Sequence, residues 1–276
     1  MSFTLFGSAV MNFLLKNGGN EMKFDDLDQK MRVYEQSLDQ IILGDLYMVA
    51  RLDGRSFSRL TKEICDFEAP FDIRFRDMMA ETIKTLMDCG FRVIYGFTES
   101  DEISLLFHPD EQTFGRKVRK YNSILSGTAS AAFSLQLGMV AAFDCRMIPL
   151  PTLDRVQDYF LWRQEDAHRN ALNAHCYWML RKEGMGVKEA TEMLEGKSVA
   201  FKNDLLFSRG INFNDLPNWQ KRGMGVYWDQ VEKVGFNPKT HQEVKTLRNQ
   251  LVVDDNLPLG ADYAAYVDRF LEQEHK

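Results

Sequence analysis

Two groups of carboxylates carry the residue types that phosphate chemistry needs. Asp53 follows a short apolar stretch, residues 46–52, and Asp101 and Glu102 lie in a polar segment between two further apolar stretches. Carboxylate oxygens suit Mg²⁺, which keeps coordination positions open for substrate phosphates. Two such ions can activate an attacking hydroxyl and stabilise a leaving pyrophosphate. Gly54 would let backbone groups approach a metal or a triphosphate closely.

Taken singly, neither group of carboxylates is specific. An Asp-Gly pair usually marks a turn, and an acidic loop tip is usually solvated. The chemistry therefore depends on whether the fold brings Asp53 and Asp101 together.

The surrounding elements predict a ferredoxin-like antiparallel sheet. Strands are expected at residues 46–52, 92–97, 103–107 and 140–147, and helices at residues 71–89 and 114–137. The order strand, helix, strand, strand, helix, strand is the split βαβ arrangement. Its first strand lies beside the hairpin of the second and third, so Asp53 and Asp101 would converge at one end of the sheet.

The rest of the chain predicts a helical extension of this α/β core. A long helix is expected at residues 154–181 and a terminal helix at residues 261–272, with shorter helices and loops between them. The expected organisation is an N-terminal extension of unknown role (1–22), a catalytic core (23–150) and a helical extension integrated with the core (151–276).

The composition is that of an ordinary folded protein and excludes several classes. Of the 276 residues, 45% are apolar. No apolar run reaches the roughly 18 residues that a membrane span requires. The four cysteines form no CxxC pair, so neither a disulfide framework nor a zinc site is predicted. A net charge of −6 still permits a local basic surface for nucleic acid. We expect a cytoplasmic protein with reduced thiols and no membrane partner.

Four ordered blocks resemble those of one enzyme family. Residues 51–57 (RLDGRSF) and 95–104 (YGFTESDEIS) resemble the two metal-binding motifs of the tRNA-His guanylyltransferase family. Residues 158–170 (DYFLWRQEDAHRN) resemble its middle region, and residues 202–223, from KNDLLF to KRG, resemble a fourth block. All four stand in the family's order at compatible spacings.

The resemblance implies a polymerase-palm-like core that uses two Mg²⁺ ions, with Mn²⁺ as a substitute, and a homodimer or homotetramer. Asp53 and Asp101 would be the side-chain metal ligands, the Gly54 carbonyl would assist them, and Glu102 would support catalysis from nearby. Nucleotide-binding residues would be Gly54, Arg55, Ser56 and Phe57 at the first motif, Ser100 at the second, and the cationic Arg146 and Lys202.

The resemblance also implies the reaction. Members of this family extend RNA in the 3′ to 5′ direction. ATP would activate the 5′-monophosphate of a tRNA, and the 3′-hydroxyl of an incoming nucleotide such as GTP would then displace AMP. Such phosphoryl transfers depend mainly on positioning and charge neutralisation.

Residues outside the metal motifs are candidates for RNA contact. Four cations open the predicted helix 114–137, namely Arg116, Lys117, Arg119 and Lys120. Such a run is often only a solvated face, although one side of it could contact tRNA phosphates. His168 and Asn170 could also contact RNA, whereas a histidine in this helix could equally pack in the core.

Three departures from the family pattern favour one of its branches. The family's His-Ile-Asn-Asn appears here as HRNA (168–171), its Phe-Asp-Gly-Arg as FDCR (143–146), and a Lys-Pro of some members as Ala69-Pro70. These point to the guanylyltransferase-like branch of bacteria and archaea, whose members tend to repair 5′-truncated tRNA using the opposite strand as template. Addition of G to tRNA-His is the alternative.

Two alternative functions are compatible with the predicted fold. A nucleotide cyclase with the same fold would need a Gly-Gly-Asp/Glu-Glu-Phe hairpin, which residues 98–102 lack. A non-catalytic RNA-binding module would expose aromatic side chains on the central strands, for which Tyr95 and Phe97 are candidates. Magnesium-dependent incorporation of nucleotide separates an enzyme from a binder.

Overall fold

The computed structural model describes residues 23–237 and 242–272. The chain divides into two units, residues 1–40 and 41–276. The first contains helix α2 (Phe24–Gln36), none of whose side chains is buried. The predicted extension 1–22 lies outside the described residues. The second unit contains the sheet and all the candidate site residues.

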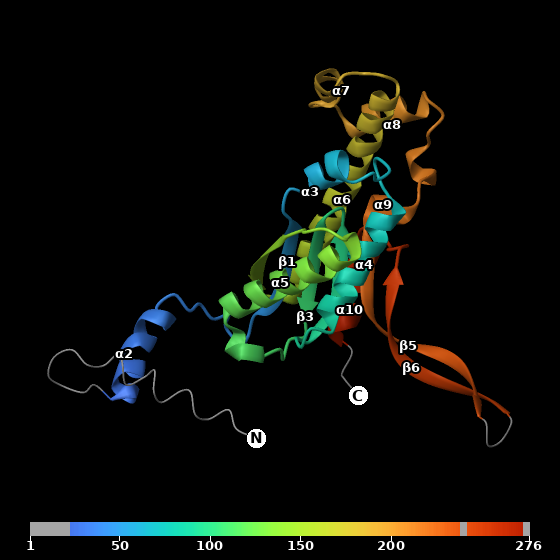
Figure 1. Ribbon diagram of the computed structural model, residues 1–276. Coiled ribbons are helices and arrows are strands. Elements are labelled where there is room, and N and C mark those ends of the chain that lie inside the picture. The colour runs from blue at the N-terminus through green and yellow to red at the C-terminus, as the bar shows by residue number, and fades with distance from the viewer. Residues whose placement is uncertain (1–22, 238–241, 273–276) are drawn as a thin grey trace. The chain divides into compact units, whose positions relative to one another are not determined.

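A six-stranded antiparallel sheet forms the centre of this unit (Figure 1). Its strands are β1 (Tyr47–Gly54), β2 (Val93–Glu99), β3 (Glu102–Phe107), β4 (Phe143–Leu150), β5 (Met224–Asn237) and β6 (Gln242–Asp254). The strands lie in the order β4-β1-β3-β2-β5-β6. The first four strands therefore have the ferredoxin-like order, and the predicted α/β fold is confirmed.

Helices α4 (Ile73–Met87) and α5 (Val118–Leu137) cover one face of the sheet. Apolar side chains between these helices and the sheet are fully buried, among them Leu52 and Leu105 on the strands and Phe133 on α5. Helix α4 packs closely over β2, because a Cβ atom at Gly96 would lie 2.4 Å from Ile83 Cγ2. The helices predicted at 71–89 and 114–137 are confirmed with shorter ends.

Helices α6 (Leu153–Lys182) and α10 (Ala261–Glu272) cover the opposite face. Tyr95 and Phe97 point into this layer and are fully buried, and the Tyr95 hydroxyl lies 3.0 Å from the Tyr263 hydroxyl. The exposed aromatic platform of an RNA-binding module is therefore absent from these two positions.

The distal half of α6 carries a small helical cluster. Helices α7 (Val187–Leu194), α8 (Val199–Phe207) and α9 (Asn218–Arg222) pack against it. Short turns complete the unit: α3 (Phe57–Arg59), η1 (Leu60–Ile64), η2 (Thr113–Arg116) and η3 (Phe213–Asp215). No described helix has the length and apolarity to cross a membrane.

Strands β5 and β6 correct the expectation of only helices and loops between residues 182 and 260. Strand β5 pairs with β2 through residues 224–227, and the rest of its length pairs with β6 alone. Away from β2 both faces of this two-stranded ribbon are largely exposed: Val234 and Leu247 on one face are 58% and 65% exposed, and the paired Lys233 and Thr246 on the other face are exposed as well. The ribbon therefore lacks the apolar alternation that marks a half-buried strand.

Candidate active site

The predicted convergence of Asp53 and Asp101 is confirmed by the backbone. Glu102 lies opposite Asp53 on β3, and the Gly54 amide donates to the Asp101 carbonyl oxygen (N–O 3.0 Å). The Arg55 amide donates to the Ala142 carbonyl oxygen at 2.8 Å. The end of β1 is therefore tied both to the β2–β3 turn and to the segment before β4.

Asp101 shares the two-residue β2–β3 turn with Ser100, whose φ of 48° lies in the left-handed region. The Ser100 hydroxyl donates to Asp101 Oδ1 at 3.1 Å. Burial raises the pKa of the Asp101 carboxyl, and the neighbouring Asp53 carboxylate raises it further. A bound cation would relieve both effects.

These carboxylates fit a hydrated divalent cation. Among the described residues, no three His, Cys, Asp or Glu side chains are grouped closely enough to hold a metal by themselves. Mg²⁺ is usually bound by one or two carboxylates together with waters and substrate phosphates, rather than by a complete protein cage. Asp53 and Asp101 match that use, and their assignment as ligands stays a prediction.

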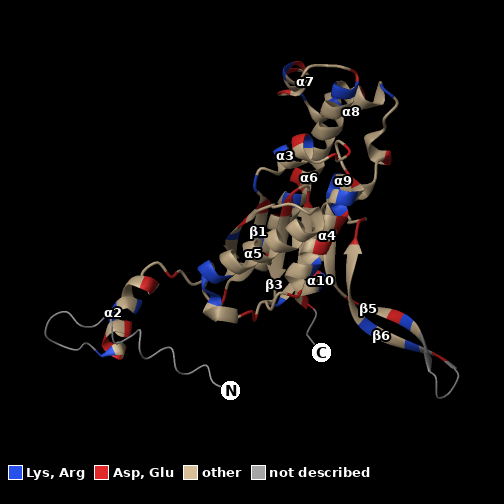
Figure 2. Cartoon of the chain, in the orientation of Figure 1, with Lys and Arg blue, Asp and Glu red and all other residues tan. Residues whose placement is uncertain are grey.

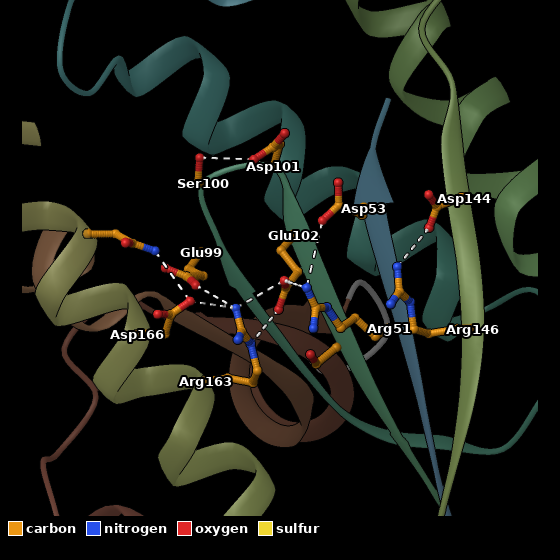
Figure 3. A network of polar contacts seen from close by, with 12 residues as sticks. Arg51, Asp53, Glu99, Ser100, Asp101, Glu102, Asp144, Arg146, Arg163 and Asp166 are labelled. Carbon is orange, nitrogen blue, oxygen red and sulfur yellow. Dashed lines mark hydrogen bonds and ion pairs between the residues drawn. The ribbon is translucent and has the colours of Figure 1, made fainter. Parts of the chain in front are cut away.

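Glu102 is held by two arginines (Figure 3). Arg163 Nε donates to Glu102 Oε1 at 2.6 Å, and Arg51 Nη2 lies 2.7 Å from Glu102 Oε2. Arg163 also contacts Glu99, whose pKa is raised by burial to about 8. Both Glu102 oxygens are thus engaged, which favours the predicted supporting role over direct metal ligation.

The turn after β1 is shaped by packing beneath it. The Phe57 ring is buried, with its centroid 5.1 Å from that of Phe133 and 4.9 Å from that of Phe143. A Cβ atom at position 54 would lie 2.5 Å from Phe57 Cγ, so only glycine fits there. The amides of Gly54 and Arg55 donate to other carbonyl oxygens, and the prediction that the backbone of residues 54–57 cradles a triphosphate stays a prediction. The left-handed Ser56 (φ 61°) is exposed beside them.

A pocket of about 810 Å³ opens beside Asp101. This volume lies within the range of small-molecule sites. Its wall includes the predicted residues Phe57, Ser100, Asp101 and Asn170, and several that sequence reasoning missed: Lys62, Arg76, Phe71, Tyr177 and Trp219. The missed residues come from four separated segments, so no local motif could have grouped them.

Arg146 lies on β4 outside this wall. Its side chain is 59% exposed, and Nη2 is 3.9 Å from Asp144 Oδ1. Asp144 lies directly opposite Asp53 in the β1–β4 register, a position that sequence reasoning did not single out. The pairing of β1 with the fourth predicted strand was the available signal. Nucleotide contact by Arg146 stays a prediction.

Lys202 does not line the pocket beside Asp101. It lies on α8 and lines a second pocket of about 400 Å³, together with Arg169, Lys197 and Asn170. Asn170 is exposed and lines both pockets, so its predicted RNA contact is sterically accessible. Nucleotide contact by Lys202 therefore stays a prediction.

Arg116 is unavailable for RNA contact, contrary to the prediction. Its side chain is buried, because turn η2 directs it under α5, where it donates to the Leu46 carbonyl oxygen and approaches Met48 Sδ at 3.3 Å. Lys117, Arg119 and Lys120 remain at the start of α5 (Figure 2). That position adjoins the start of β1, about 20 Å from Asp53 at the usual rise per residue.

His168 is half-buried, and its ring packs edge-on against Phe213 at a centroid distance of 5.3 Å. Burial lowers its pKa, so the neutral ring is favoured. This geometry supports the packing alternative for His168 more than the RNA contact.

The fold and the site define a class. Paired carboxylates at the end of β1 and in the β2–β3 turn of a ferredoxin-ordered sheet form a palm-like nucleotidyltransferase core. Residues 28–151 match the family model described as tRNAHis guanylyltransferase, and residues 154–256 match that described as Thg1 C terminal domain. The chain belongs to the tRNA(His) guanylyltransferase family, which is a family of nucleotidyltransferases.

Individual relatives agree with this assignment. The chain is 29% identical over 243 residues to tRNA(His) guanylyltransferase of Schizosaccharomyces pombe, covering 82% of this chain and 92% of the relative. It is 29% identical to tRNA(His) guanylyltransferase 1 of Arabidopsis thaliana, of which it spans only 39%. Among solved structures, a bacterial Thg1-like protein in complex with ATP superposes with a TM-score of 0.70 at 27% identity, covering 89% and 99% of the two chains. A bacterial Thg1-like protein in complex with GTP gives a TM-score of 0.68 at 28% identity, covering 90% and 100%.

Proposed function

We propose that this chain is a metal-dependent nucleotidyltransferase that activates and extends the 5′ end of tRNA, and that its substrates are 5′-truncated tRNAs repaired against a template. One observation carries the proposal: Asp53 and Asp101 converge at one end of the sheet, and Asp101 lines a pocket large enough for a nucleotide. Membership of the tRNA(His) guanylyltransferase family supports the choice of tRNA as the acceptor.

The reaction has two balanced steps. In the first, a 5′-phosphate oxygen of the tRNA attacks the α-phosphorus of ATP, and pyrophosphate leaves. In the second, the 3′-hydroxyl of an incoming nucleoside triphosphate attacks the 5′-phosphate of the tRNA, and AMP leaves. Mg²⁺ bound at Asp53 and Asp101 would neutralise the charge that develops on the transferred phosphoryl group.

The pocket beside Asp101 is proposed to hold the nucleotide. Lys62 on its wall can neutralise phosphate oxygens, and its aromatic side chains offer stacking surfaces for a base. Structural relatives solved in complex with ATP or GTP support nucleotide binding by this chain.

A departure from the family's His-Ile-Asn-Asn motif favours templated repair over addition of G. The second asparagine of the family's His-Ile-Asn-Asn is Ala171 here, and it is fully buried in α6. The polar amide at that position is therefore missing, and Arg169 brings a cation where the family motif has isoleucine. A tRNA(His) guanylyltransferase is the second candidate, which is the name that the relative from Schizosaccharomyces pombe bears.

We expect nucleotide addition to follow the opposite strand. A tRNA lacking its first 5′ nucleotide is incubated with the protein, ATP, Mg²⁺ and each labelled nucleoside triphosphate in turn. Only the nucleotide complementary to the base on the 3′ strand should be incorporated. Changing that base should change the nucleotide incorporated. Addition of G to tRNA-His alone, whatever the opposite base, would sink the repair proposal and leave the guanylyltransferase.

A further inference from the structure

One buried arginine ties helix α6 to the β2–β3 turn (Figure 3). The Arg163 side chain is 4% exposed. Its Nη2 donates to Glu99 Oε1 at 3.0 Å and to Glu102 Oε2 at 3.0 Å, and its Nε donates to Glu102 Oε1 at 2.6 Å. Asp166, one turn further along α6, lies 3.2 Å from the same Nη2.

The two glutamates that Arg163 binds lie at the two ends of the β2–β3 turn. Glu99 and Glu102 are the last register pair of β2 and β3, and the turn between them consists of Ser100 and Asp101 alone. A single guanidinium therefore holds both ends of the turn that carries Asp101. The planar fork of arginine suits this bridging, whereas a lysine ammonium is a point charge.

Arg163 also binds some carboxylates of the site and leaves another without an arginine partner in the described structure. Arg163 and Arg51 together bind both carboxylate oxygens of Glu102, and Arg163 also donates a hydrogen bond to Glu99. Asp101, in contrast, has the Ser100 hydroxyl as its hydrogen-bond donor in the described structure. Three acidic side chains in four residues are thus divided into two that support the turn and one that is left for a cation.

We propose that Arg163 is a positioning residue for the metal site: it fixes the β2–β3 turn so that the Asp101 carboxylate faces Asp53. It acts through Glu99 and Glu102 and touches no reacting atom. This inference rests on the proposed function, because it presumes that Asp53 and Asp101 bind the metal.

Other roles for Arg163 predict different results. If it acted only as a nearby positive charge, its removal would strengthen cation binding, because like charges repel. If it only stabilised the fold, its removal would leave the metal affinity of the folded protein unchanged. A positioning role alone predicts weaker metal binding by protein that remains folded.

The test measures binding of Mn²⁺ to the full chain without tRNA or nucleotide, by electron paramagnetic resonance of the free ion. Wild type is compared with Arg163→Met and Arg163→Lys. The control is Arg155→Met on the same helix, where the arginine pairs with Asp158 at 2.6 Å and is 65% exposed. The thermal midpoint of each variant shows whether it is folded at the temperature of the measurement.

Arg163→Met is expected to raise the Mn²⁺ dissociation constant about 10- to 100-fold, the usual cost of losing a side chain that orients a metal ligand. Arg163→Lys should raise it by a smaller factor, and Arg155→Met should leave it unchanged. An unchanged or lower dissociation constant in folded Arg163→Met overturns the inference. If that variant does not fold, an unchanged constant in Arg163→Lys overturns it. Equal binding by wild type and Asp101→Asn would instead refute the metal site itself.

Discussion

Replacement of Asp101 by asparagine is expected to lower nucleotide incorporation into tRNA by about 10³-fold or more in a protein that stays folded. Metal ions contribute several kcal/mol to such transfers, and each 1.36 kcal/mol corresponds to a factor of about ten in rate. Asparagine keeps the shape of the side chain but loses the charge that would hold the cation. Initial rates at saturating tRNA and nucleotide, over a range of Mg²⁺ concentrations, measure the loss.

The stability of this variant distinguishes a catalytic effect from a folding defect. Because burial disfavours the charged Asp101, the neutral asparagine should not lower the free energy of unfolding at neutral pH. Asp110→Asn, in the loop after β3 where the side chain is 81% exposed, is the matched control and should retain full activity. Activity of Asp101→Asn within tenfold of wild type would refute the assignment of Asp101 as a metal ligand.

Gly223→Ala is expected to cost about 3 kcal/mol of stability or more. Gly223 joins α9 to β5 at φ 72° and ψ −166°, a region that essentially only glycine occupies. A Cβ atom there would lie 2.5 Å from the Thr98 carbonyl oxygen and 2.7 Å from the buried Phe97 ring. Strain costs about 1 to 3 kcal/mol, and the overpacking adds a similar amount. Urea-induced unfolding followed by circular dichroism measures the change.

Gly184→Ala separates strain from the clash. Gly184 also has a positive φ, 95°, but a Cβ atom there would meet nothing within 4 Å. This control should cost only about 1 to 2 kcal/mol, the penalty of a left-handed conformation. If the two alanine variants lose the same free energy of unfolding, the clash of a Cβ atom at residue 223 with β2 does not destabilise the protein.

The core of the fold could be predicted because its elements are locally marked. Strands β1 to β3 are short apolar runs, a polar turn joins β2 to β3, and α4 between β1 and β2 carries apolar residues at helical spacing. The β5–β6 ribbon could not be predicted, because most of its described residues beyond the part that pairs with β2 are exposed on both faces and so give no apolar alternation. Its assignment requires the pairing of residues 224–227 with β2, a contact distant in sequence.

Site residues could be predicted only where they stand close together in a short sequence motif. Asp53, Asp101 and Glu102 stand in compact motifs, and the topology alone brings them together. The cation Arg116 was misassigned because its exposure depends on turn η2, in which Phe114 and Gly115 have positive φ angles. The role of Arg163 and the pocket wall of Lys62 and Trp219 arise from tertiary contacts, which leave no local pattern in the sequence.

The most direct test of the central claim asks which end of the tRNA is modified. A 5′-monophosphorylated tRNA lacking its first nucleotide is incubated with the protein, Mg²⁺ and ATP labelled at its α-phosphate, with and without the complementary nucleoside triphosphate. We predict label on the 5′ end as an adenylylated intermediate, and its release as AMP when the complementary nucleotide is added. Label at the 3′ end, or no label despite tight tRNA binding, would contradict the account.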